Sequence, residues 1–147
     1  MARPRHRCGY SLIELLVVAG IVAMLAAIAV PGYRSHMLRV HRTEAIQALL
    51  ALAAAQERHH LQHGRYAAAL GAADDGTVER LPLSTATDGG RYRLAIDAAD
   101  ELMFTARAAA IGTQADDRAC ATFGIDETGA RTAWNRSGAR NDAGCWR

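Results

Sequence analysis

Glu14 is the residue whose position has the clearest chemical consequence in this sequence. It is the only charged residue within the apolar stretch that runs from residue 10 to residue 30. A carboxylate at membrane depth costs on the order of 3 kcal/mol, so an acid in such a stretch is a functional candidate by default. Burial of the charge is far less costly beside a cation. We therefore expect Glu14 to pair with an ammonium group.

Catalytic combinations are missing from the C-terminal half of the sequence. All six histidines lie at or before position 63, which removes Ser/His and Cys/His nucleophilic pairs from residues 64–147. The sequence also has neither a P-loop nor a glycine-rich dinucleotide motif. We expect no enzyme activity, no catalytic residue and no cofactor.

Histidines and paired acids raise the question of a metal ion. His59 and His63 are four residues apart and share one helical face, with His60 beside them. A third ligand is not evident, and transition-metal sites usually have about three or four. Asp116 and Asp117 fall short of the roughly six to eight oxygen ligands of calcium. We interpret the histidines as a solvated helix end and the two acids as a turn, and expect no metal site.

The basic residues are unevenly distributed. All 17 are arginines, and Arg3, Arg5 and Arg7 precede Gly9, whereas all 15 acids follow it. Removal of residues 1–9 would leave a chain near neutrality, without the charge footprint of a nucleic-acid-binding protein. Arginines near the C-terminus do accompany Trp134 and Trp146, a combination that can bind single strands. Nearby acids dilute that charge, so a solvated surface is favoured and nucleic-acid binding is not expected. These residues are Arg131, Arg136, Arg140 and Arg147, with the acids Asp126, Glu127 and Asp142.

The 21 residues 10–30 would form a helix roughly 32 Å long, about one hydrocarbon thickness. The basic residues before it should stay cytoplasmic, so the part that follows is translocated. An ordinary signal peptide cleaved near Ala27-Ile28-Ala29 and a plain signal anchor both fit this outline. Neither explains an acid in the opening turns of the apolar run. An exported chain with Cys120 and Cys145 predicts one disulfide, and Cys8 lies in the leader.

The sequence GYSLIE at residues 9–14, followed by the apolar run and Pro31, resembles the N-terminal signature of type IV pilins. Tyr10-Ser11 stands where the usual form has Phe-Thr. The resemblance implies that a prepilin peptidase cuts between Gly9 and Tyr10, and that the new amine of Tyr10 is N-methylated. It also implies that Glu14 acts in assembly by pairing with the N-terminal amine of a neighbouring subunit. Pairing with the amine of its own chain is the alternative.

The remaining sequence predicts one amphipathic helix and one sheet. Pro31 and Gly32 predict a kink or local unwinding. Helical spacing predicts a helix over 34–63 that ends at Gly64. Most charged residues, Glu44 among them, lie away from its apolar stripe, which consists of Leu38, Arg42, Ala45, Leu49, Leu52 and Gln56. Residues 67–90 predict a loop or a short helix. Alternating residues then predict four strands that form an antiparallel sheet covered by the helix. The strands are expected near 91–97, 102–107, 119–125 and 130–134.

We therefore expect an α+β, lollipop-like pilin fold. Its expected parts are a leader (1–9), a transmembrane half-helix (10–30), an amphipathic half-helix (31–63) and a β head (64–147) with a C-terminal disulfide loop. The C-terminal Cys-Trp pattern most resembles PilE-type minor pilins. Expected partners are other pilins, the inner-membrane assembly platform and the prepilin peptidase/N-methyltransferase.

The expected function is that of a minor pilin in pilus assembly, with associated twitching motility or adhesion. Its location would be the inner membrane with a periplasmic head, and then the extracellular pilus. A type II secretion pseudopilin and a signal-anchored periplasmic binding domain are the alternatives.

Overall fold

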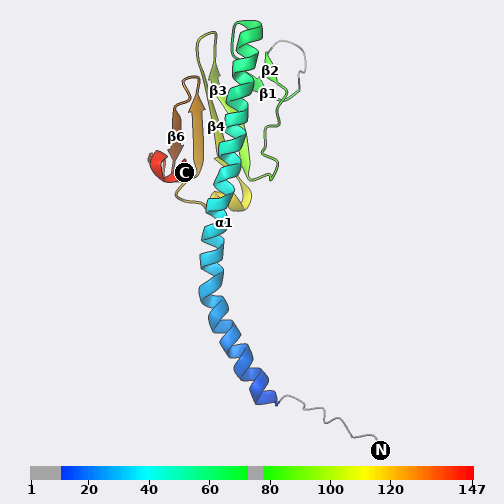
Figure 1. The fold of residues 1–147 in the computed structure, drawn as a ribbon, viewed down its shortest axis with the longest axis vertical. Helices are drawn as coiled ribbons and strands as arrows, with labels where there is room; N and C mark the ends of the chain where they lie inside the picture. Colours follow the sequence, from blue (N-terminus) through cyan, green and yellow to red (C-terminus); the bar gives the residue numbers. More distant parts are fainter. Residues whose placement is uncertain (1–10, 73–77) are drawn as a thin grey trace, which may run out of the picture. The chain divides into compact units, whose positions relative to one another are not determined.

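A computed structural model of the protein describes residues 11–72 and 78–147 (Figure 1). Gly9 and Tyr10, the predicted cleavage and methylation site, lie outside the described residues. The chain divides into two units, one reaching to His36 and one from Met37 to Arg147. The elements in chain order are α1 (Leu12–His63), β1 (Ala69–Leu70), β2 (Arg80–Leu81), β3 (Tyr92–Ala99), β4 (Phe104–Ala110), the 3-10 helix η1 (Gly112–Asp116), β5 (Thr122–Asp126), β6 (Arg131–Trp134) and α2 (Asp142–Cys145).

Helix α1 ends where the sequence predicts. Its last residue is His63, and Gly64 follows with a φ of 72°, a left-handed conformation that glycine adopts without steric cost. Pro31 and Gly32 are both helical in the structure. The kink expected at these two residues stays a prediction.

The second unit contains the predicted four-stranded antiparallel sheet, in the order β3-β4-β5-β6. Alternate residues of these strands point inward, and Tyr92, Phe104 and Phe123 on this face are fully buried. The part of α1 that follows Met37 lies across this face (Figure 1). The α+β fold with a helix covering one sheet face is therefore confirmed. The helix residues that the core buries are Ala45, Leu49, Leu52, Ala55 and Gln56.

Gln56 connects α1 to the start of the head through hydrogen bonds. Its side chain is fully buried, donates to the Ala67 carbonyl at 2.8 Å and accepts from the Ala67 N–H at 2.9 Å. A buried backbone group without a partner costs about 1–3 kcal/mol, so this amide satisfies two groups that no strand pairs. The helical spacing placed Gln56 on the buried stripe, and the structure gives the reason for a polar residue there.

The strand predictions need two corrections. Leu102 and Met103 are not in a strand: β3 runs on to Ala99, and the side chain of Asp100 accepts the N–H groups of both residues at 2.7 and 2.8 Å. Four residues, 100–103, therefore form the turn. The third strand was predicted from Ala119, but β5 begins only at Thr122, because the chain before it turns around the carboxylate of Asp117.

The segment 67–90 was predicted as a loop or a short helix, and it instead contributes two very short strands. β1 and β2 pair in parallel, with Ala69 opposite Arg80 and Leu70 opposite Leu81. Leu70 and Leu81 are buried in the core. The burial of these two leucines explains why the described residues of 67–90 pack against the head although few of them favour strands.

Candidate functional site

Glu14 lies in the first turn of α1 and is exposed. Its side chain has no partner among the described residues, which exclude Tyr10. The large apolar residues around it are exposed too, for example Leu12 at 80% and Leu16 at 63%. An 18-residue window of this helix has a mean hydropathy of 2.7 and is 0% buried. The helix is thus long and apolar enough to cross a membrane, and its surface has no cover within the described chain.

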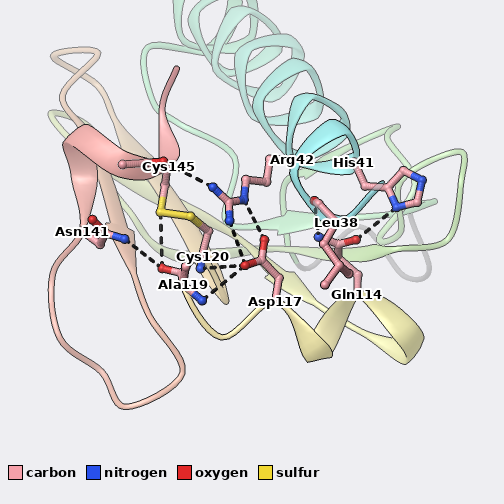
Figure 2. Close-up of polar contacts among 10 residues, drawn as sticks. Leu38, His41, Arg42, Gln114, Asp117, Ala119, Cys120, Asn141 and Cys145 are labelled. Atoms are coloured by element: carbon pink, nitrogen blue, oxygen red, sulfur yellow. Dashed lines mark hydrogen bonds and ion pairs between the residues drawn. A yellow bond between two sulfur atoms is a disulfide. The ribbon is translucent and has the colours of Figure 1, made fainter. Parts of the chain in front are cut away.

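Arg42 and Asp117 form the main ionic contact between α1 and the head (Figure 2). The guanidinium donates to both carboxylate oxygens, with Nε to Oδ2 at 2.7 Å and Nη2 to Oδ1 at 2.9 Å. The two side chains are only 14% and 4% exposed, so solvent screens the pair little. Two parallel bonds of this kind fix direction as well as distance. The pair therefore sets where the η1–β5 connection sits on the helix.

The same carboxylate organises the start of the disulfide loop. Asp117 Oδ1 accepts the N–H groups of Ala119 and Cys120, each at 3.3 Å. Cys120 is bonded to Cys145, and Arg42 Nη1 also donates to the Gly144 carbonyl at 3.3 Å. The predicted disulfide is thus present. Arg42 contacts Asp117, just before the loop that this disulfide closes, and Gly144, at the end of the loop.

Gln114 makes a second polar contact between η1 and the helix. Its amide nitrogen donates to the Leu38 carbonyl at 3.0 Å, and its Oε1 is 3.2 Å from Nδ1 of His41 (Figure 2). The fully buried Tyr92 lies in the core. Burial, and then the negative charge of Asp117, raise the pKa of Tyr92, so the hydroxyl stays neutral.

Glu44 joins α1 to the turn before β3. It accepts from the hydroxyl of Thr87, from the N–H of Gly89 at 3.1 Å and from Nη1 of Arg91 at 2.9 Å. Partial burial raises the pKa of Glu44, but the hydrogen bonds from Thr87 and Arg91 outweigh it, and the pKa falls below its ordinary value of 4.5. The stabilisation from these contacts is therefore present above pH 4.5 and is lost as the pH falls through the lowered pKa.

The outer face of the sheet carries a shallow groove of about 620 Å³. Trp134 lies over Gly124, where an added Cβ would come within 3.1 Å of the indole. Arg107 and Arg136 also line this groove, and Arg136 lines a second one of about 560 Å³ together with Arg118. The N–H of Arg136 donates to the Arg118 carbonyl at 3.0 Å. Arg136 thus shares one groove with Trp134 and the other with Arg118, and neither arginine forms an ion pair in the described residues.

The tail that follows is tied down at several points. Trp146 Nε1 donates to the Thr132 carbonyl at 2.7 Å, and the indole packs edge-on against Phe123 with ring centroids 5.8 Å apart. Arg131 lies over the same indole, 5.4 Å from its centroid. Asp142 accepts from Ala133 N–H and from Arg140. These contacts hold the tail against β6 and the core.

The three histidines at the end of α1 bond to backbone carbonyls. His60 Nε2 is 2.9 Å from the Glu101 carbonyl, and its ring stacks on Tyr66. His59 and His63 stack on each other with centroids 4.2 Å apart. Within residues 11–72 and 78–147, no three His, Cys, Asp or Glu residues are grouped for a metal ion.

Sequence reasoning missed how two acids are used. Asp117 was interpreted as part of a turn and Glu44 was placed on the solvent face of the helix, yet each holds an arginine. A signal for the first was present, because Arg42 falls on the apolar stripe of α1 and a charge there needs a partner. No comparable signal marks Glu44, whose partners come from a distant turn.

The long helix, uncovered at its start and packed on an antiparallel sheet in its second half, defines the fold of a pilin subunit. A family model described as "Type IV minor pilin ComP, DNA uptake sequence receptor" matches residues 31–124, and a model of the prokaryotic N-terminal methylation motif matches residues 4–30. The chain belongs to this type IV minor pilin family. The resemblance expected from residues 9–14 is confirmed, and pilins are structural subunits, not enzymes.

Individual relatives match over about two-fifths of the chain. "Prepilin peptidase-dependent protein D" of Escherichia coli (strain K12) is 39% identical over 56 residues, which are 38% of this chain and 38% of that protein. "Type IV major pilin protein PilE1" of Neisseria gonorrhoeae is 38% identical over 58 residues, 40% of this chain and 35% of that protein. The matched part spans less than two-fifths of either relative.

One solved structure is similar over most of the chain. The non-core minor pilin PilV of Neisseria meningitidis has a TM-score of 0.50 at 21% sequence identity. The match covers 71% of this chain and 94% of that one. At this identity the likeness concerns the fold alone.

Replacement of Arg42 by methionine tests the helix-to-head contact. We expect Arg42→Met to lower the free energy of unfolding by about 3–5 kcal/mol, because it leaves Asp117 buried without its cation. The measurement is urea unfolding of the full chain in detergent at neutral pH, followed by the fluorescence of Trp134 and Trp146. Arg39→Met is the matched control, since Arg39 is exposed on the same helix and forms no ion pair in the described residues. Equal losses in the two variants would contradict the assignment.

Proposed function

We propose that this chain is a minor subunit built into a bacterial type IV pilus. The observation that carries the proposal is the apolar first half of α1, whose large side chains are exposed around the single acid Glu14. Before assembly the membrane covers this surface. After assembly the corresponding helices of neighbouring subunits cover it, so that one segment serves as anchor and as filament core.

The precursor is cut between Gly9 and Tyr10, and the new amine of Tyr10 is methylated. The methylation-motif match over residues 4–30 supports this step. Before assembly the chain spans the inner membrane once through residues 10–30, with the head in the periplasm, and it then enters the extracellular pilus. Its partners are the processing enzyme, the assembly platform and other pilins.

Glu14 pairs with the N-terminal amine of a neighbouring subunit in the filament. A carboxylate surrounded by apolar helices is costly unless it has a cation, and it has none among the described residues of its own chain. Pairing between chains satisfies two charges at once and also fixes the axial register of adjacent subunits. The head then determines the role of the pilus, with twitching motility and adhesion as the proposed outcomes.

Replacement of Glu14 by glutamine tests this role. We expect the amount of Glu14→Gln subunit in sheared filaments to fall about tenfold or more relative to the membrane fraction, because the partner amine is left buried without its counter-charge. The measurement is quantitative immunoblotting of the two fractions. Glu101→Gln is the control, since Glu101 is exposed in the β3–β4 turn. A Glu14→Gln subunit that enters filaments at the wild-type level would refute the pairing.

A second candidate function is DNA binding by the head. The description of the matching family model includes a DNA uptake sequence receptor, and the grooves around Trp134, Arg118 and Arg136 offer one aromatic platform and two cations. Two of the three acids that dilute this surface in the sequence have local partners in the structure. Asp126 accepts from Thr128 and Ala130, and Asp142 from Ala133 and Arg140.

Gel-shift assays of the full chain in detergent test the second candidate. We expect Arg118→Gln and Arg136→Gln each to weaken binding of an oligonucleotide and to reduce the slope of log K against log salt by about one. Arg58→Gln, an exposed arginine on α1, is the control and should leave the slope unchanged. Equal effects of all three substitutions, or no binding at low salt, would eliminate this candidate.

A further inference from the structure

We propose that His59 and His63 form a two-histidine site for a divalent transition-metal ion at the C-terminal end of α1. The pair has the spacing of two histidines on one helical face, as in the helical zinc motifs that use positions i and i+4. The two rings are nearly parallel, at 20°, with centroids 4.2 Å apart. His63 is exposed and His59 half-buried, so an ion could reach the pair from solvent.

The hydrogen bonds determine which ring nitrogen is available. Nδ1 of His59 lies 3.0 Å from the Arg65 carbonyl, and Nδ1 of His63 lies 3.0 Å from the His59 carbonyl. A carbonyl oxygen can only accept, so Nδ1 carries the proton in both rings. In the neutral ring this leaves the lone pair on Nε2. Metal-binding histidines characteristically donate their other N–H to a carbonyl or a carboxylate, which fixes the tautomer and the ring orientation.

The distance between the rings suits one shared ion. Bonds from zinc to imidazole nitrogen are about 2.0–2.1 Å, so one ion joins two nitrogens that are roughly 3 to 3.4 Å apart. The rings, stacked with centroids 4.2 Å apart, have to tilt so that the lone pairs of both Nε2 atoms converge on the ion. The ion bridges adjacent turns and so adds a cross-link to the last part of the helix.

Neighbouring side chains do not complete the coordination. Glu57 accepts from the hydroxyl of Tyr66, and Glu79 pairs with Arg65. His60 is turned toward Glu101 and is covered by Tyr66. Water or a donor from another molecule therefore fills the remaining positions. Imidazole ligands suit copper, nickel and zinc. Among these divalent ions, we expect Cu²⁺ to bind with the highest affinity.

Calorimetric titration of the full chain in detergent with NiCl₂ tests the proposal. We expect one site whose affinity falls about a hundredfold in either His59→Ala or His63→Ala, because the loss of one ring removes the intramolecular second contact. His60→Ala is the matched control from the same helical turn and should keep the wild-type affinity. The comparison among variants also cancels any metal bound by His6 or Cys8.

A second measurement distinguishes loss of the metal site from loss of the fold. Saturating Ni²⁺ should raise the unfolding temperature of wild type and of His60→Ala by mass action, and it should not raise that of the other two variants. Circular dichroism of the four metal-free proteins checks that the helix is retained. Equal nickel affinity in all four proteins would overturn the proposal, as would an effect of only one of the two histidines.

Discussion

The long helix α1 has to satisfy two different environments, and the rest of the structure depends on this constraint. Its first part presents large apolar side chains that water would solvate poorly, from Leu12 at 80% exposed to Ile28 at 79%. Its second part buries Leu49 and Leu52 against the sheet. A segment of this kind is stable only where lipid or other apolar helices cover its start. The proposed assembly role follows from these two environments of one helix.

The head is held to the second part of α1 by apolar burial, and polar contacts then set its position. Arg42 directs the η1–β5 connection through Asp117, and Glu44 directs the turn before β3 through Arg91. The Cys120–Cys145 bond closes the loop that starts at Asp117. A buried pair adds less net stability than its short distances suggest, because desolvation opposes the attraction. Its structural effect is to select one arrangement of head and helix in this unit.

Periodicity was sufficient to predict α1 and the four-stranded sheet, but it missed the short strands β1 and β2. It also failed where a single side chain decides the backbone. The end of α1, the buried stripe through Leu49 and Gln56, and four antiparallel strands were all predicted, because each depends on repeats of hydrophobicity. The predicted first residues of the second and third strands were wrong because the side chains of Asp100 and Asp117 accept backbone N–H groups there. A periodic pattern of hydrophobicity does not report such hydrogen bonds. The partners of Arg42 and Glu44 lie 75 and 47 residues away, and their pairing depends on the folded sheet.

The mass of the mature N-terminus tests most directly whether both parts of α1 stay in one mature chain. The protein would be purified from membranes and from sheared filaments, and its N-terminal peptide sequenced by tandem mass spectrometry. The account predicts a chain that begins at Tyr10 with a methylated α-amine in both fractions. A chain that begins at Val30, after removal of the apolar segment as an ordinary signal peptide, would contradict it, because neither an anchor nor Glu14 would then remain.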